Sequence, residues 1–148
     1  MEFKPIFEAG FHDITVEQID DIFVTPFENN DRRRYLTDRL KAFFERFFDL
    51  GLSAEIWLDG SYSTIKPEPG DIDILIVFNP DEINALPVDK HPILNELFNR
   101  DLSKIRYNLD VLLLQSDNVN QRSYWRGWFG YSRTEEPKGI PRIFYGIN

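Results

Sequence analysis

The chain has 148 residues, a formal net charge of −8 and no cysteine, so disulfide bonds and thiolate metal sites are excluded. This length fits one domain with its own core, and the negative charge disfavours nucleic acid as a partner without excluding it. No apolar run approaches the roughly 20 residues that span a bilayer, and no signal peptide is recognisable, so we expect a cytoplasmic protein without membrane contact.

Two helices are predicted in the first third of the chain. Thr15-Val16-Glu17-Gln18 has the capping-box pattern that opens a short helix, and Pro26 ends it. A longer helix follows the N-cap candidates Asn29-Asn30-Asp31, and Gly51 suits its C-terminal end. Its first turn holds Arg32-Arg33-Arg34, which we expect to be solvated, with a partner or nucleic-acid role as the alternative. Apolar residues recur at helical spacing through this segment: Leu36, Leu40, Phe43, Phe44, Phe47 and Leu50.

Strands and helices alternate through the middle of the chain. Ala54–Leu58 and Asp71–Phe78 are predicted strands, and β-branched and aromatic residues make the second typical of a buried sheet. A short helix at Ser61–Ile65 and a loop rich in proline and glycine are expected between them. A helix at Pro92–Asp101 and a third strand at Asn108–Leu114 follow.

The end of the chain is aromatic and basic. From Asn118 onward the formal charge is +3, which leaves −11 on the residues before it. We predict an amphipathic helix at Gln121–Phe129 and a late strand at Ile140–Tyr145. Pro141 lacks a backbone N–H, so this strand is expected at an edge of the sheet.

These elements predict an α/β (α+β) fold with one mixed sheet of about four to five strands flanked by helices. We expect a single domain over residues 1–148. Its core covers about residues 31–116, with a helical N-terminal extension at 1–30 and an aromatic and basic C-terminal segment at 117–148.

Three aspartates lie in or beside the predicted apolar strands. Asp71 and Asp73 are two residues apart, so both side chains point to one face, while Asp110 lies within Leu109-Asp110-Val111 on another strand. A bare carboxylate in such surroundings is costly to bury, which favours a cation between the strands. Magnesium prefers oxygen ligands of this kind. We therefore predict Asp71, Asp73 and Asp110 as metal ligands and catalytic residues, with two ions bound.

A glycine–serine pair precedes the aspartates. Gly60 allows the backbone to approach a phosphate closely, and Ser61 supplies a hydroxyl and a backbone N–H, so both are predicted nucleotide-binding residues. Lys66 is a third candidate, with a solvated loop lysine as the alternative. The alternative for Gly60-Ser61 is a tight turn with a helix cap. For Asp59 a turn-forming role is favoured over a role that supports the site.

In their order and spacing these residues resemble the DNA polymerase β-type nucleotidyltransferase superfamily. The resemblance covers roughly residues 55–114 and rests on Gly60-Ser61, Asp71-Ile72-Asp73 and Leu109-Asp110-Val111. It implies the nucleotidyltransferase fold, magnesium as cofactor and a nucleoside triphosphate, ATP in the first instance, as donor. Leu58-Asp59-Gly60-Ser61-Tyr62-Ser63-Thr64, Lys66 and Lys138-Gly139-Ile140-Pro141-Arg142 are also similar to uncharacterised stand-alone bacterial members of that superfamily.

The resemblance leaves the acceptor open. Larger relatives carry a second helical domain, for which 148 residues leave no room. The favoured expectation is an antitoxin-like enzyme of a bacterial toxin–antitoxin or defence system, which moves AMP to a hydroxyl of a HEPN-type toxin or similar partner protein. The alternatives are adenylylation of a small molecule or an RNA end, and a non-catalytic interaction module that binds nucleotide or metal.

Overall fold

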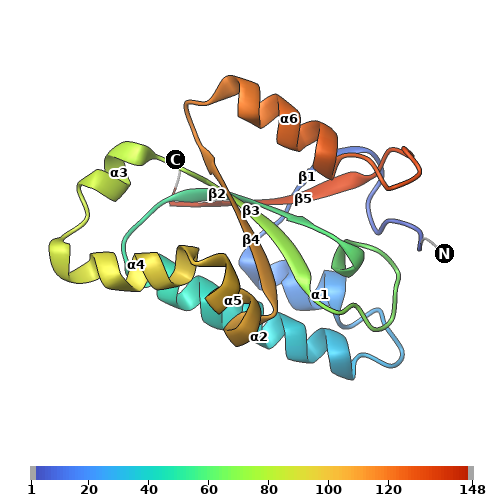
Figure 1. The fold of residues 1–148 in the computed structure, drawn as a ribbon. Helices are drawn as coiled ribbons and strands as arrows, with labels where there is room; N and C mark the ends of the chain where they lie inside the picture. Colours follow the sequence, from blue (N-terminus) through green and yellow to red (C-terminus); the bar gives the residue numbers. More distant parts are fainter. Residues whose placement is uncertain (1–2, 147–148) are drawn as a thin grey trace.

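The computed structural model describes residues 3–146, so residues 1–2 and 147–148 of the predicted domain lie outside the described part. Five strands form one mixed sheet in the order β1-β5-β2-β3-β4 (Figure 1). Strand β2 is antiparallel to both of its neighbours, whereas β1 and β5, and β3 and β4, are parallel pairs. The predicted class, a mixed sheet flanked by helices, is confirmed. The strands are β1 (Gly10–Asp13), β2 (Ala54–Asp59), β3 (Ile72–Phe78), β4 (Leu109–Gln115) and β5 (Gly139–Tyr145).

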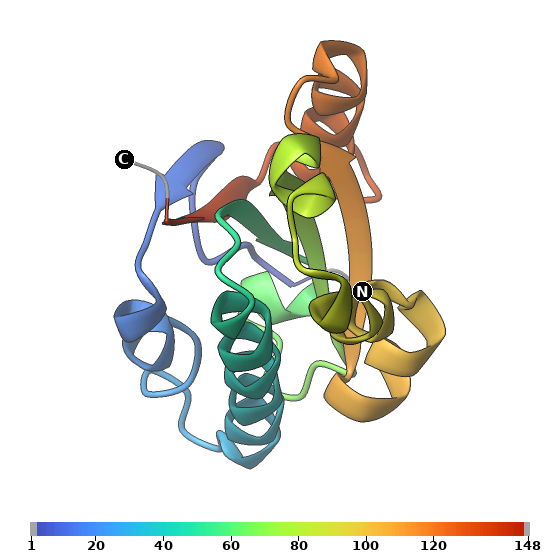
Figure 2. The same cartoon turned by 90° about the vertical axis from the view of Figure 1, so that its left-hand side faces the viewer.

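Helices cover the two faces of the sheet unequally (Figure 2). One face carries α1 (Ile19–Phe23), α2 (Asp31–Asp49), α4 (His91–Phe98) and α5 (Arg100–Tyr107), and the other carries α6 (Val119–Phe129). The short α3 (Pro80–Asn84) follows β3. Three 3₁₀ turns complete the described helical elements: η1 (Val16–Gln18), η2 (Ser61–Ser63) and η3 (Val88–Lys90).

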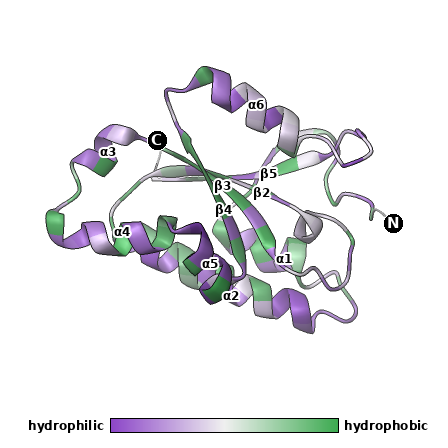
Figure 3. Cartoon of the chain, viewed as in Figure 1, coloured by the Kyte–Doolittle hydropathy of each residue, from purple (hydrophilic) through white to green (hydrophobic). Residues whose placement is uncertain are grey.

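Alternation along the strands divides the buried residues into two cores. Ile56, Ile74 and Val111 belong to the larger core, which packs against α1, α2 and α4. Trp57 and Leu75 belong to the smaller core, which Phe129 of α6 completes. Because both faces are covered, β3 is apolar over most of its length, and Figure 3 shows the central strands largely in the hydrophobic colour. Asp59, Asp73 and Asp110 project on the α6 face.

The strongest helix prediction is confirmed by α2, whose apolar residues at helical spacing are buried in the larger core. Gly51 follows its end with φ +79°, a conformation that glycine adopts without a Cβ clash. The short helix after Thr15 is also confirmed, with the Gln18 side chain accepting from the Thr15 N–H at 2.9 Å. These features follow from local sequence, which explains why they were predictable.

Helix α6 and strand β5 form where a helix and a strand were predicted, but the N-terminal segment and the place of β5 in the sheet differ from the prediction. Residues 1–30 were expected to be helical, but Gly10–Asp13 forms β1, and Pro5 bridges to Thr64. Strand β5 was expected at an edge and instead lies between β1 and β2. Its pairing with β2 stops at Arg142, so Pro141 pairs only with His12 of β1 and interrupts no ladder on the β2 side.

One predicted helix is two. The segment predicted as Pro92–Asp101 divides at Asn99, whose extended backbone (ψ 113°) ends α4 and whose side chain accepts from Leu102 N–H to cap α5. Helix α5 escaped prediction because its sequence is largely polar, and two of its apolar residues, Leu102 and Ile105, are exposed. Of the helices among residues 3–146, none is long and apolar enough to cross a membrane.

Candidate functional site

Three aspartates form a row across the neighbouring strands β2, β3 and β4, near one end of these strands. Asp73 of β3 is the register partner of Asp59 on β2 and of Asp110 on β4. The three side chains therefore project from adjacent strands on the same face, and we call them the carboxylate row. Asp71 directly precedes β3 and acts on Asp73 electrostatically. The structure thus brings together the three aspartates predicted from the sequence and adds Asp59.

A cation lies at each end of the carboxylate row. Lys138 Nζ lies 2.5 Å from Asp59 Oδ1, and both side chains are largely buried. At the other end Arg100 makes a two-point contact with Asp110, with Nε donating to Oδ1 at 2.5 Å and Nη2 donating to Oδ2 at 2.9 Å. Among the ion pairs within the described residues, Asp73 takes part in none. The middle of the row therefore carries the uncompensated charge.

This arrangement shifts the pKa values of the three aspartates by different amounts and in different directions. Burial, followed by repulsion from the neighbouring carboxylates, raises the pKa of Asp73 from 3.8 to about 6, although Lys138 opposes the shift. The pKa of Asp110 is lowered, because Arg100 donates hydrogen bonds to its charged form. Burial also raises the pKa of Asp59, against the attraction of Lys138. Perturbed carboxylates that cluster in this way mark candidate functional sites.

Gly60 turns the chain directly beside the row. Its φ of +79° favours glycine, and a Cβ added there would lie 2.9 Å from Asp73 Oδ2. Ser61 then opens η2, with its carbonyl accepting from the Thr64 hydroxyl at 2.7 Å. Gly60 therefore lies close to the Asp73 carboxylate. The phosphate-binding role of Gly60 and Ser61 stays a prediction.

Substitution of Gly60 by alanine should therefore be costly. Gly60→Ala places a methyl group against the Asp73 carboxylate and forces a left-handed conformation, so we expect a loss of roughly 2–3 kcal/mol in the free energy of unfolding. Gly51→Ala is a matched control, because its φ is also +79° and its added Cβ meets nothing within 4 Å. Urea denaturation of both variants measures the difference, and equal losses would contradict the close contact.

The first turn of α2 holds the segment between η2 and β3. Arg33 is fully buried, and burial lowers its pKa to about 10. Arg32 donates to the carbonyls of Pro69 and Gly70, directly before Asp71. The expectation of a solvated arginine triplet is wrong for Arg33, because its carbonyl acceptors lie 10 to 33 residues away and leave no local signal. It donates to the carbonyls of Phe23, Tyr62, Thr64 and Lys66.

Lys66 enters this network through its backbone. Its carbonyl accepts from Arg33, and Lys138, not Lys66, is the lysine that acts on Asp73. A nucleotide-binding role of Lys66 stays a prediction. Sequence reasoning missed the positions of Lys138 and Arg100 at the site. The motif Lys138-Gly139-Ile140-Pro141-Arg142 was a signal for the first, whereas nothing local pointed to the second.

The donor chemistry of the site suits a cation that arrives with its own oxygen ligands. Within residues 3–146 no three acidic or histidine side chains converge closely enough to hold a metal ion by themselves. Magnesium is commonly bound by one or two carboxylates together with substrate phosphates, and Asp71 and Asp73 offer such a pair. Asp110 is engaged by Arg100 through both oxygens. The residues therefore fit a nucleotide-borne cation better than a closed three-aspartate cage.

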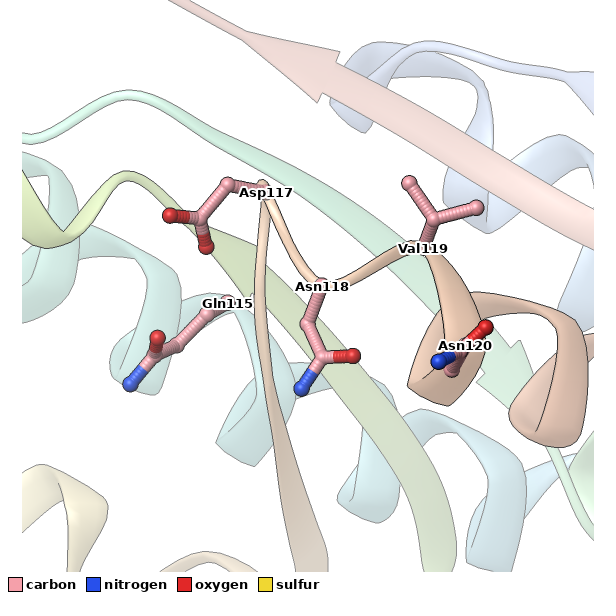
Figure 4. Close-up of a pocket in the computed structure, with 5 residues that line it drawn as sticks. All are labelled: Gln115, Asp117, Asn118, Val119 and Asn120. Carbon is pink, nitrogen blue, oxygen red and sulfur yellow. The ribbon is translucent and has the colours of Figure 1, made fainter.

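Two hollows of the surface lie away from the row. The pocket in Figure 4, of about 440 Å³, is formed by Gln115 and residues 117–120 at the far end of β4 from Asp110. Gln115 lies five residues further along the strand than Asp110, which is about 16 Å. A second hollow, of about 540 Å³, lies between η1, α2 and β5. Neither is lined by a residue of the row, so we assign the site by its chemistry and not by its depth.

Comparison with known proteins identifies one family. The chain matches, over residues 1–144, a family described as a family of unknown function (DUF6932), and it belongs to that family. No curated protein and no solved structure matches the chain. The match includes the whole carboxylate row, Gly60-Ser61, Arg100 and Lys138.

Proposed function

We propose that this chain is a magnesium-dependent nucleotidyltransferase, which moves a nucleoside monophosphate, AMP in the first instance, from a nucleoside triphosphate to a hydroxyl group. The observation that carries the proposal is the register of the carboxylate row. Asp73 lies between aspartates on both neighbouring strands and touches the Gly60 turn. Like charges placed in this way destabilise the empty site, and a cation accompanied by phosphates relieves that repulsion.

In the proposed reaction the acceptor oxygen forms a bond to the α-phosphorus. The bond from that phosphorus to the oxygen bridging the α- and β-phosphates breaks, and pyrophosphate leaves. When bound, a magnesium ion held by Asp71 and Asp73 would neutralise the negative charge of the phosphates. Gly60 lets the backbone approach the phosphates, and the Ser61 hydroxyl donates to one of them.

The acceptor hydroxyl must lose its proton. Asp59 is paired with Lys138, and both oxygens of Asp110 accept from Arg100. In the described structure Asp73 is the member of the row without an ion-pair partner. Its carboxylate oxygens are therefore the ones most available to the cation, and the proton of the acceptor hydroxyl passes to water.

A protein is the acceptor that the surface favours. Tyr124 and Trp128 lie one helical turn apart on α6, and Tyr131 follows the helix; all three are more than half exposed. Exposed aromatic side chains are enriched at protein interfaces. Lys138 N–H donates to the Gly130 carbonyl, so the segment after α6 is tied to the residue that pairs with the row. We therefore include in the proposal the acceptor that the antitoxin-like resemblance implies, which is a HEPN-type toxin or a similar partner protein.

The experiment that tests the proposal follows label from ATP carrying ³²P at the α-phosphate. The protein is incubated with this ATP, magnesium and cell lysate, and the labelled products are separated. We expect the parent to label a protein. In the Asp71→Ala variant the amount of label transferred should fall by at least about 10²-fold, because one of two cation-binding carboxylates is lost. Asp117→Asn, at the far end of β4, is the control and should label as the parent does.

The outcomes separate the alternatives. Equal labelling by the parent and Asp71→Ala would overturn the proposal of an enzyme. Label that depends on Asp71 but resides in RNA or a small molecule would keep nucleotidyl transfer and replace the protein acceptor.

A further inference from the structure

Arg100 occupies both oxygens of Asp110. Its Nε and Nη2 atoms donate to Oδ1 and Oδ2 at 2.5 and 2.9 Å, which leaves the carboxylate little capacity for a cation. A two-point arginine–carboxylate contact is among the stronger and more directional hydrogen-bonded pairs. In this arrangement one of the predicted metal ligands is blocked by a residue of the same chain.

The two cations of the row differ in their freedom to move. The Lys138 side chain is 12% exposed, whereas that of Arg100 is 61% exposed. Removal of Lys138 from Asp59 would leave two buried charges unpaired. Arg100 can leave Asp110 by rotation of its own side chain into solvent, because little of it is packed. The Arg100 end of the row is therefore the exchangeable end.

The position of Arg100 on its helix favours an anion nearby. Arg100 is the first residue of α5, where the positive end of the helix dipole disfavours a cation. Asp110 offsets that charge in the observed arrangement. If Asp110 turned to a metal ion, Arg100 would be free to take a second anion, and the planar guanidinium fork matches the oxygens of a phosphate.

We propose that Arg100 is an exchangeable ligand, which holds Asp110 in the empty site and moves to the phosphates of the nucleoside triphosphate when a cation engages Asp110. This inference rests on the proposed function and deepens it, because it assigns a phosphate-binding residue and an inhibitory contact to the same side chain. It also explains why Asp110 becomes free to bind a cation only when the nucleotide is present, since the phosphates then take the place of Asp110 as the partner of Arg100.

Arg100→Gln should change two affinities in opposite directions. Binding of Mn²⁺ alone, followed by electron paramagnetic resonance, should become about 2–10-fold tighter, because Asp110 is released. Binding of a non-hydrolysable ATP analogue with a methylene bridge between the α- and β-phosphates, measured in magnesium by calorimetry, should weaken by about tenfold, because a charge-assisted contact to phosphate is lost. Arg100→Lys keeps the charge without the fork and should weaken nucleotide binding less.

Arg106→Gln is the matched control. Arg106 lies on the same helix and pairs with Glu96, away from the row, so this variant should change neither affinity. If the parent binds both ligands and Arg100→Gln binds them equally well, the inference is overturned and the proposed function stands. Loss of both affinities in Arg100→Gln would overturn the exchange as well, since it would make Arg100 a structural support. A parent that binds neither Mn²⁺ nor the analogue overturns the proposed function and the inference together.

Discussion

Asp73→Asn is expected to make the protein more stable and inactive. The substitution keeps the shape of the side chain and removes the charge that its neighbours oppose. Burial and the neighbouring carboxylates raise the pKa of Asp73 to about 6, so at pH 7 the side chain is mostly charged and that charge destabilises the folded protein. We expect a gain on the order of 1–3 kcal/mol in the free energy of unfolding at pH 7 without divalent cations. The proposed nucleotidyl transfer should fall by about 10²–10³-fold.

The gain should follow pH in a defined way. A carboxyl with a raised pKa binds its proton more tightly in the folded than in the unfolded chain, so its contribution to stability is greatest at low pH. That contribution is lost as the pH rises from about 4 to about 6. The difference in unfolding free energy between Asp73→Asn and the parent should therefore be small below pH 4, grow to pH 6 and level above it.

Urea denaturation of both proteins between pH 3.5 and 8 measures that difference, and titrations shared by the two proteins cancel in it. Asp117→Asn, an exposed aspartate outside the row, serves as the control and should give a flat difference. If Asp73→Asn were less stable than the parent at pH 7, favourable contacts of the charged carboxylate would outweigh its repulsion by the neighbouring carboxylates, and the prediction would be wrong.

Lys138→Met is expected to be the most destabilising substitution at the site. Its ammonium group lies 2.5 Å from Asp59 Oδ1, and the side chains are 12% and 8% exposed. Removal of one partner of a buried pair leaves an uncompensated charge, which typically costs about 3–5 kcal/mol. Because a domain of this size is stable by only about 5–15 kcal/mol, thermal and urea unfolding should both shift strongly.

Two further variants separate the buried charge from other effects of the change. The double variant Asp59→Asn with Lys138→Met removes both charges and should recover most of the lost stability. Lys41→Met breaks a similar lysine–aspartate pair with Asp20, whose side chains are 37% and 39% exposed, and should cost at most about 1 kcal/mol. If Lys138→Met were no more costly than Lys41→Met, the buried pair would not contribute as its burial implies.

The parts of the fold that depend on local pattern were predictable. The apolar period of 3.6 residues located α2, and alternation in an apolar run located β3 and put Asp73 on the face opposite Ile72 and Ile74. The four-residue β1 has no comparable pattern, since it is short and only partly buried. It forms because β5 offers an edge to pair with, which is a property of the sheet and not of residues 10–13.

The amino-acid sequence by itself determined that Gly60-Ser61 and three aspartates on or beside apolar strands form a candidate cation and phosphate site. Spacing and residue type carry that information, because the direction of a side chain from a strand is set locally. Only the tertiary structure decided that Asp59 joins the row, that Lys138 neutralises one end, and that Arg100 blocks Asp110 at the other. Those relations join residues brought together by strand register and helix packing, and electrostatic coupling depends on distance in space, which the order of residues does not give.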